Sequence, residues 1–210
     1  MNLLAISEIL HKANVWHRIE EDFICTRRTR TKIPNINNNI AYLAGVITGD
    51  GSLTICKRKK GGYCYKINIV GQKHEMENLA KLIKELFSYK VKVFRDKRKQ
   101  NCYFINIYNA AIFAYFNKLG FLPGKKRNVC VPQVIAKDSS LFKHYMIGLI
   151  NTDGYIDGRT VHLKQRDENF LKQLIVLLKR HFNIKSNPPK VNITAGKPYY
   201  YIRFPNKLQP

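Results

Sequence analysis

Two apolar, glycine-rich segments with nearly the same residue pattern occur about a hundred residues apart. Residues 42–51 read Tyr-Leu-Ala-Gly-Val-Ile-Thr-Gly-Asp-Gly, and residues 145–154 read Tyr-Met-Ile-Gly-Leu-Ile-Asn-Thr-Asp-Gly. Each has a helix-length apolar run, and each ends in an aspartate that precedes a glycine. A repeat of this kind indicates two related halves, so it constrains the fold more than any other feature of the chain.

Small residues lie at two positions four residues apart in each segment. In a helix this spacing puts both on one face, where they would let a second backbone approach closely. We expect the two segments to form helices that pack on each other, which would bring Asp50 and Asp153 side by side. The small residues are Gly45 and Gly49 in the first segment and Gly148 and Thr152 in the second.

The terminal aspartates stand at an electrostatically unfavourable place. A helix C-terminus carries unpaired carbonyl groups and partial negative charge, which disfavour a carboxylate there. The glycine after each acid indicates a left-handed helix cap. Carboxylate and carbonyl oxygens together form a ligand set for a hard divalent cation. We therefore predict metal ligands at Asp50 and Asp153, with the preceding residues, Gly49 and Thr152, contributing to the same sites.

The charge of the chain indicates a polyanionic partner. Its 210 residues include 37 Lys and Arg against 14 Asp and Glu, a formal net charge of +23. Because 45% of the residues are hydrophobic, we expect a folded domain that binds nucleic acid and not a disordered basic tail. No apolar run is long enough to span a bilayer and no signal-peptide pattern is present, so we expect a soluble, intracellular protein. The five cysteines contain no C-x-x-C pair, which argues against a zinc site.

Hydrophobic periodicity predicts the same order of elements in both halves. That order is αββαββα in the first half and αββαββ in the second, so we predict an α+β fold built from a pseudo-two-fold duplication. The predicted elements of the first half are strands at 52–58, 63–70, 90–93 and 102–107 and helices at 74–87 and 110–119; those of the second are strands at 159–165, 190–195 and 199–204 and a helix at 168–182.

Two segments fall outside this repeat. Residues 1–38 carry an amphipathic pattern and then the basic run 27–32, from which we predict a helix followed by a basic arm that contacts phosphates. The alternative for this arm is a solvated tether. Residues 123–138, rich in proline, glycine and basic residues, are predicted to be a linker between halves at 39–122 and 139–210.

The first glycine-rich segment resembles the nonapeptide that names the LAGLIDADG homing endonucleases. Residues 43–51 read Leu-Ala-Gly-Val-Ile-Thr-Gly-Asp-Gly, and residues 147–154, Ile-Gly-Leu-Ile-Asn-Thr-Asp-Gly, resemble a second copy. Two copies, each followed by paired strands and a helix in a basic chain, are typical of the single-chain members of that family. The resemblance covers residues 39–204 and leaves the N-terminal extension unexplained.

This resemblance implies a fold and a chemistry. In single-chain members the two motif helices form a pseudo-symmetric interface, and two saddle-shaped antiparallel sheets lie in the DNA major groove. The terminal acids, which match Asp50 and Asp153, hold divalent metal at the scissile phosphates; Mg²⁺ is expected, and Mn²⁺ or Ca²⁺ would occupy the same sites. The implied activity of the monomer is a double-strand break with short 3′ overhangs in a long, asymmetric duplex.

Four further residues resemble catalytic positions of the family. Gln72 and Lys73, after the second strand, resemble the polar and basic pair beside the metal site, and Gln165 and Arg166 hold the matching place in the second half. A cation there would ease deprotonation of water or stabilise the leaving oxygen. The alternative is that all four are ordinary exposed residues. Because Gln72 and Gln165 differ in strand phase, the match requires a β-bulge at Gly71.

The polar faces of the strands are predicted to read the DNA bases. Half-exposed strands alternate in any case, so plain solvent exposure is the alternative for each single residue. The basic runs 57–60, 95–99 and 125–127 are predicted to contact phosphates. The reading residues are Ser52, Thr54, Arg58, Lys66, Asn68, Lys90, Lys92 and Asn106 in the first half and Thr160, His162, Lys164, Lys190, Asn192, Thr194, Tyr201 and Arg203 in the second.

Other functions on the same fold stay open. A maturase that binds intron RNA, or a DNA-binding protein that does not cut, would share these motifs. Retention of both terminal acids favours a nuclease but is compatible with a nuclease that is also a maturase. A nuclease embedded in an intein is not expected, because Met1 is not a nucleophilic Cys or Ser and the chain ends at Pro210 without His-Asn.

Overall fold

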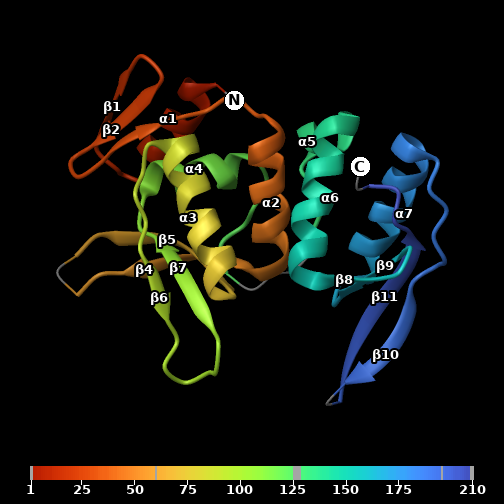
Figure 1. The fold of residues 1–210 in the computed structure, drawn as a ribbon. Coiled ribbons are helices and arrows are strands. Elements are labelled where there is room, and N and C mark those ends of the chain that lie inside the picture. Colours follow the sequence, from red (N-terminus) through yellow and green to blue (C-terminus); the bar gives the residue numbers. More distant parts are fainter. Residues whose placement is uncertain (1, 60, 125–128, 195, 209–210) are drawn as a thin grey trace. The chain divides into compact units, whose positions relative to one another are not determined.

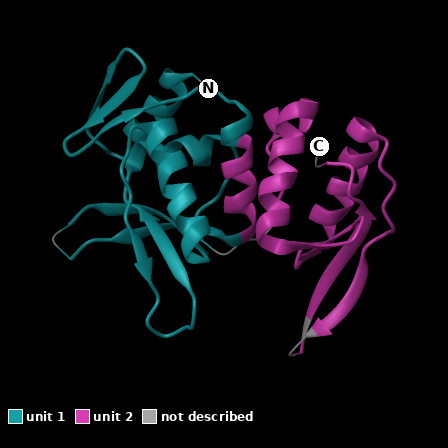
Figure 2. Cartoon of the chain, in the orientation of Figure 1, with its two compact units in different colours: residues 1–40, 50–125 teal, residues 41–49, 126–210 magenta. Residues whose placement is uncertain are grey.

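The computed structural model describes residues 2–59, 61–124, 129–194 and 196–208. The chain forms two compact units, residues 1–40 with 50–125 and residues 41–49 with 126–210 (Figure 2). The first motif helix, α2 (Asn38–Asp50), passes through both, and its middle belongs to the second unit. Within the described residues, no helix is both long and apolar enough to cross a membrane.

The first unit contains the first repeat, apart from residues 41–49, and a folded N-terminal extension (Figure 1). Its repeat follows the predicted order, with two strands, a helix, two strands and a final helix after the motif helix. The elements are α1 (Leu3–Lys12), β1 (His17–Glu20), β2 (Phe23–Thr26), β3 (Arg30–Lys32), β4 (Gly51–Lys57), β5 (Tyr63–Gly71), α3 (Lys73–Phe87), β6 (Val93–Arg95), β7 (Tyr103–Ile107) and α4 (Ala110–Lys118).

The main sheet of the first unit is antiparallel with strand order β4-β5-β7-β6. One face is apolar and is covered by α3 and α4 (Figure 1). Because side chains alternate along a strand, the opposite face carries the polar residues of β4, β5 and β7. The buried residues of the covered face, all at most 3% exposed, are Leu53, Ile67, Ile69, Ile105 and Ile107.

The N-terminal extension begins with the predicted helix, α1, and then forms a small sheet where we predicted a basic arm. After α1 the chain forms an antiparallel sheet of order β1-β2-β3, and the basic run supplies the β2–β3 turn and strand β3. Ile24 and Thr31 of this sheet are fully buried. Strands of three or four residues with charged outward side chains give little period-two signal, which is why the pattern resembled a tether.

The second unit has the predicted order αββαββ after α5, without a counterpart of α4 among the described residues. Its sheet has the order β10-β11-β9-β8, which corresponds to that of the first, and α7 packs on β9 and β11. Part of the predicted linker is the short helix α5, whose Ile135 is fully buried. The elements are α5 (Gln133–Lys137), α6 (Ser139–Asp153), β8 (Gly154–Asp157), β9 (Thr160–Gln165), α7 (Glu168–Phe182), β10 (Lys190–Thr194) and β11 (Lys197–Pro205).

The middle of α2 packs directly against α6, as the small residues predict. A Cβ atom at Gly45 would overlap the carbonyl oxygen of Tyr145, and a Cβ at Gly148 would overlap the carbonyl oxygen of Tyr42. Tyr42 and Tyr145 occupy the same position of the two motifs, so the contact is reciprocal, as expected for a two-fold arrangement. Backbone therefore meets backbone at both crossing points.

Two hydrogen bonds repeat the same symmetry. The Tyr145 hydroxyl donates to the Thr48 hydroxyl at 2.9 Å, and the Asn151 amide donates to the Tyr42 hydroxyl at 3.4 Å. Thr48 and Asn151 are also equivalent motif positions. Burial raises the pKa of Tyr145, which keeps its hydroxyl protonated as a donor.

Tyr115 of α4 is a buried tyrosine whose hydroxyl lacks a hydrogen-bond partner within the described part of the chain. Burying an unpaired polar group costs about 1–3 kcal/mol. We predict that Tyr115→Phe raises the free energy of unfolding by about 1 kcal/mol in urea denaturation. The matched control is Tyr145→Phe, which should lower stability because it removes the bond to Thr48. Destabilisation by Tyr115→Phe would contradict this assignment.

Substitution of the crossing glycines should disrupt the helix pair. Gly45→Ala or Gly148→Ala forces a Cβ into a backbone carbonyl, so either should lower the free energy of unfolding by about 1–3 kcal/mol despite the better helix propensity of alanine. The control is Asn39→Ala, an exposed position of α2. Urea denaturation checks the prediction, and equal stability of the glycine variants and the control would contradict it.

Candidate functional site

Both motif helices end at their aspartate, as predicted: α2 ends at Asp50 and α6 at Asp153. The expected left-handed cap is wrong for both motifs, because Gly51 does not have a positive φ and Gly154 has φ −118° and ψ 171°. The lack of space for a side chain explains why position 154 is a glycine. A Cβ there would lie 2.9 Å from the Ile150 carbonyl oxygen and 3.1 Å from that of His162. The chain thus passes directly from helix into strand.

Asp153 is half-buried and held by the neighbouring strand. The Gln165 side-chain amide donates to Asp153 Oδ2 at 2.6 Å. The backbone of α2 also approaches this end of α6: a Cβ at Gly49 would overlap the Thr152 hydroxyl and lie 3.0 Å from Asp153 Oδ2. The small residue at position 49 therefore leaves room for the carboxylate. Asp50 is exposed.

The strand registers show that Gln72 and Gln165 do not occupy equivalent places. Gly51 pairs with Ile69 and Gly154 pairs with Leu163, so the position two residues later is Gly71 in the first half and Gln165 in the second. Strand β5 pairs regularly with β7 through Gly71, and the bulge that the match requires is absent there. The first sheet thus has no side chain where the second has Gln165.

The other three predicted catalytic residues have different neighbours. Gln72 is the N-cap of α3, and its backbone N–H donates to the Glu75 carboxylate at 2.8 Å. Lys73 lies 3.9 Å from Glu77 in a surface pair. The Arg166 guanidinium donates to the Tyr199 hydroxyl at 2.7 Å. Of the four residues, Gln165 is hydrogen-bonded to a motif aspartate, whereas the contacts described for the other three are with Glu75, Glu77 and Tyr199.

The ligand chemistry at the helix ends suits a hard divalent cation. The described residues contain no group of three or more His, Cys, Asp or Glu side chains able to hold a metal. An aspartate and the adjoining helix-end carbonyls supply oxygen ligands, which Mg²⁺ and Ca²⁺ prefer. Such a partial set fits a metal whose remaining ligands are water or substrate phosphate, the usual arrangement for Mg²⁺.

The uncovered face of the first sheet carries a row of polar residues across three strands. Ser52 faces Asn68, and Asn68 faces Asn106, to which its amide donates at 2.9 Å. Lys66 faces Thr54 in the next row. The predicted residues of these strands therefore share one surface. Three predicted residues lie beyond the strands, namely Arg58 after β4 and Lys90 and Lys92 before β6.

The second sheet carries cations interleaved with aromatic rings. The registers form two rows across the strands, Tyr155–His162–Arg203 and Lys164–Tyr201–Lys190. The Tyr155 and His162 rings stack at 4.4 Å, and Lys164 Nζ lies 4.3 Å from the centre of the Tyr199 ring. An open groove follows this surface and is lined by residues of both rows together with Leu163, Val191 and Asn192. Thr160 lies in β9 and Thr194 ends β10.

The predicted reading residues include Tyr201 but omit two other exposed aromatic residues of these faces, Phe94 and Tyr155. Phe94 is 44% exposed and stacks on Phe104, and Tyr155 is 61% exposed. Tyr155 lies in β8, which had no predicted range. A signal for β8 is present, because Asp157-Gly158 is a hairpin-turn dipeptide and Gly158 has φ +54°.

The predicted phosphate-contacting runs are only partly described by the structure. Residues 57–59 are exposed around the end of β4. In the run 95–99, Arg98 pairs with Asp96 at 3.1 Å. Lys60 and the run 125–127 lie outside the described residues.

Comparisons with known proteins agree with this geometry. Residues 143–207 match the model of a LAGLIDADG-like domain. Several solved structures of the homing endonuclease I-DmoI are similar. Its complex with DNA and Ca is 15% identical with a TM-score of 0.63, covering 80% of this chain and 82% of that chain. Its complex with DNA and Mn is 18% identical with a TM-score of 0.59, covering 81% and 90%.

A second group of solved structures shares the fold. The N-terminal LAGLIDADG domain of DUF199/WhiA is 18% identical with a TM-score of 0.51, covering 79% of this chain and 74% of that chain. No curated protein matches the chain in sequence. These findings confirm the predicted fold class and the resemblance carried by the two motifs. Residues 143–207 thus match a LAGLIDADG-like domain, and the chain has the fold of the two-motif homing endonuclease structures.

Proposed function

We propose that this chain is a divalent-metal-dependent DNA endonuclease that cuts both strands of a long, asymmetric duplex and leaves short 3′ overhangs. The observation that carries the proposal is the aspartate at the end of each motif helix. One acid in each half supplies one metal-dependent site for each DNA strand. Because one chain contains both halves, a monomer suffices.

The relatives and the charge support this proposal. I-DmoI, a homing endonuclease of the same fold, has been solved with DNA together with Ca or Mn. A net charge of +23 favours a polyanionic substrate by releasing counterions from DNA. The structural matches offer no support for intron RNA as a partner.

Residues at the end of each motif helix have distinct tasks in this mechanism. Asp50 and Asp153 would hold the metal, with Gly49 and Thr152 beside them. A bound divalent metal supplies an activated water and neutralises charge on the phosphate. Gln165 fixes the rotation of the Asp153 carboxylate through its 2.6 Å hydrogen bond, which keeps the oxygen ligands in one orientation.

The uncovered sheet faces would read the DNA in the major groove. Asparagine recognises adenine and arginine recognises guanine through paired hydrogen bonds. The row Ser52–Asn68–Asn106 corresponds by register to Tyr155–His162–Arg203 in the second sheet. These rows differ in hydrogen-bonding groups and charge, so the two half-sites should differ in sequence.

Removal of either acid should stop double-strand cleavage. Asp50→Asn or Asp153→Asn keeps the side-chain shape but weakens the metal site, so linear product from a target plasmid should disappear while duplex binding persists. The target is obtained by selecting bound members of a randomised duplex library, and its cleavage is then tested in Mg²⁺. Full cleavage by the double variant would sink the proposal, and tight specific binding without any cleavage by the parent chain would identify a DNA-binding protein instead.

Gln165 should affect the two DNA strands unequally. Gln165→Ala keeps Asp153 but removes the hydrogen bond that orients its carboxylate. Cutting of one strand should therefore slow by about 10–100-fold, and nicked plasmid should accumulate. Higher Mg²⁺ should partly restore that cut. The control is Gln72→Ala, which removes a side chain at the N-cap of α3 and should leave nicking balanced. Equal slowing of both strands by Gln165→Ala would contradict a positioning role.

A further inference from the structure

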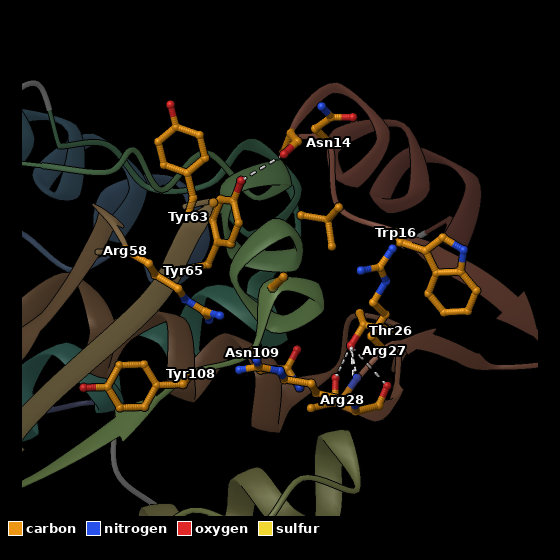
Figure 3. A pocket seen from close by; sticks show the side chains of 15 residues that line it. Asn14, Trp16, Thr26, Arg27, Arg28, Arg58, Tyr63, Tyr65, Tyr108 and Asn109 are labelled. Atoms are coloured by element: carbon orange, nitrogen blue, oxygen red, sulfur yellow. Dashed lines mark hydrogen bonds between the residues drawn. The ribbon is translucent and has the colours of Figure 1, made fainter. Parts of the chain in front are cut away.

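A pocket lies between the N-terminal extension and the first sheet, and Arg58 is the one predicted reading residue in its described lining (Figure 3). Three segments form it: the end of α1 with residues 13–16, the β2–β3 turn at 26–29, and residues of the β4–β5 hairpin with the start of α4. In Figure 3, Arg58 and Tyr108 stand on one side of the pocket and Trp16 and Arg27 on the other.

The extension forms a fixed wall of this pocket. The Tyr65 hydroxyl of β5 donates to the Ala13 carbonyl at 3.2 Å. The amide of Asn109, which is 2% exposed, donates to the buried Thr31 hydroxyl at 2.8 Å, while its carbonyl oxygen caps α4. Both contacts join the extension to the core of the first unit. The pocket is therefore formed before any ligand arrives, which lowers the entropic cost of binding.

The positive charges of the pocket are not neutralised within the described residues. Arg27, Arg28 and Arg58 line it without an ion pair among the described residues, and no described lining residue is acidic. The two other arginines of the extension differ, since Arg18 and Arg30 pair with Glu20.

The β2–β3 turn holds two of these arginines in place. The Thr26 hydroxyl accepts the N–H groups of Arg28 at 3.3 Å and Thr29 at 3.2 Å, and the Thr26 N–H donates to the Thr29 carbonyl at 2.7 Å. Arg27 and Arg28 thus project from a hydrogen-bonded turn, an arrangement suited to binding phosphate.

Aromatic rings with uncovered faces complete the lining. Trp16 is 52% exposed, Tyr63 is 56% exposed and Tyr108 is 52% exposed. Large exposed aromatic side chains beside unpaired arginines are the combination that binds single-stranded nucleic acid, because every base has a face that can stack. Bases inside a duplex are already stacked and cannot enter such a pocket.

We propose that this pocket binds an unpaired nucleotide segment, with a base stacked on the aromatic rings and the adjoining phosphates held by Arg27 and Arg28. The two sheet faces would read duplex, whereas this site takes a single strand of either sugar type. The pocket is separate from the aspartates, so the inference does not depend on cleavage. It gives the N-terminal extension a function that the two-motif repeat leaves unassigned.

Trp16 is the one tryptophan of the chain, so its fluorescence reports on this pocket directly. The full chain is titrated with oligo(dT) and with oligo(U) of about eight nucleotides, and with a random duplex of equal length. We expect single strands to quench the fluorescence of Trp16. The oligonucleotide that binds more tightly identifies the preferred sugar. Absence of quenching by both, or equal quenching by duplex, would overturn the proposal.

Substitutions of two kinds test the contributions of arginine charge and of aromatic stacking separately. Arg27→Ala with Arg28→Ala should weaken single-strand binding at least about tenfold and reduce its salt dependence by roughly two phosphate contacts. Tyr108→Leu should weaken binding, and Tyr108→Phe should restore it. The matched control is Arg180→Ala, an exposed arginine of α7. All variants are compared by circular dichroism and duplex cleavage; unchanged oligonucleotide affinity in the folded arginine variant would refute the assignment.

Discussion

The contact between α2 and α6 is the interaction on which the second unit depends. At Gly45 and Gly148 each backbone lies against a carbonyl group of the opposite helix, so neither position has room for even one methyl group. Dispersion contacts over so short a separation, with hydrogen bonds at Thr48 and Asn151, fix the two helices in one register. That register in turn sets where α6 ends and where Asp153 lies against Gly49 and Gln165.

The fold was predictable where a local period marks each element. The helix at 168–182 and the strand at 103–107 match the predicted bounds closely, because their buried faces follow a clear period along at least five residues. The small-residue spacing likewise predicts the helix contact. The sheet of the extension was missed because three short strands bury few side chains each, and α5 because five residues are too few to establish a period.

The sequence predicts the two helix-terminal acids of the site, but it does not predict which strand residues lie beside them. Position in the motif identifies Asp50 and Asp153 as helix-terminal acids, whereas the partner of Asp153 depends on which residue of β9 lies beside it. Strand register is a long-range property, so phase alone could not decide whether Gln72 or Gly71 corresponds to Gln165. The polar residues of each sheet lie together on its uncovered face, as the alternation along the strands predicts. Phe94 and Tyr155 were overlooked because they resemble core residues in sequence.

The assignment of residues 41–49 to the second unit bears on how such a chain can be divided. A fragment cut in the segment between the repeats would lack α2 and would expose the face of α6 that carries Tyr145 and Gly148. This uncovered apolar face, where Gly148 lets another backbone approach closely, is suited to packing against a second copy of the same helix. A free second half would thus be expected to self-associate through α6, so a two-motif chain and a dimer of one-motif chains are related by a single cut.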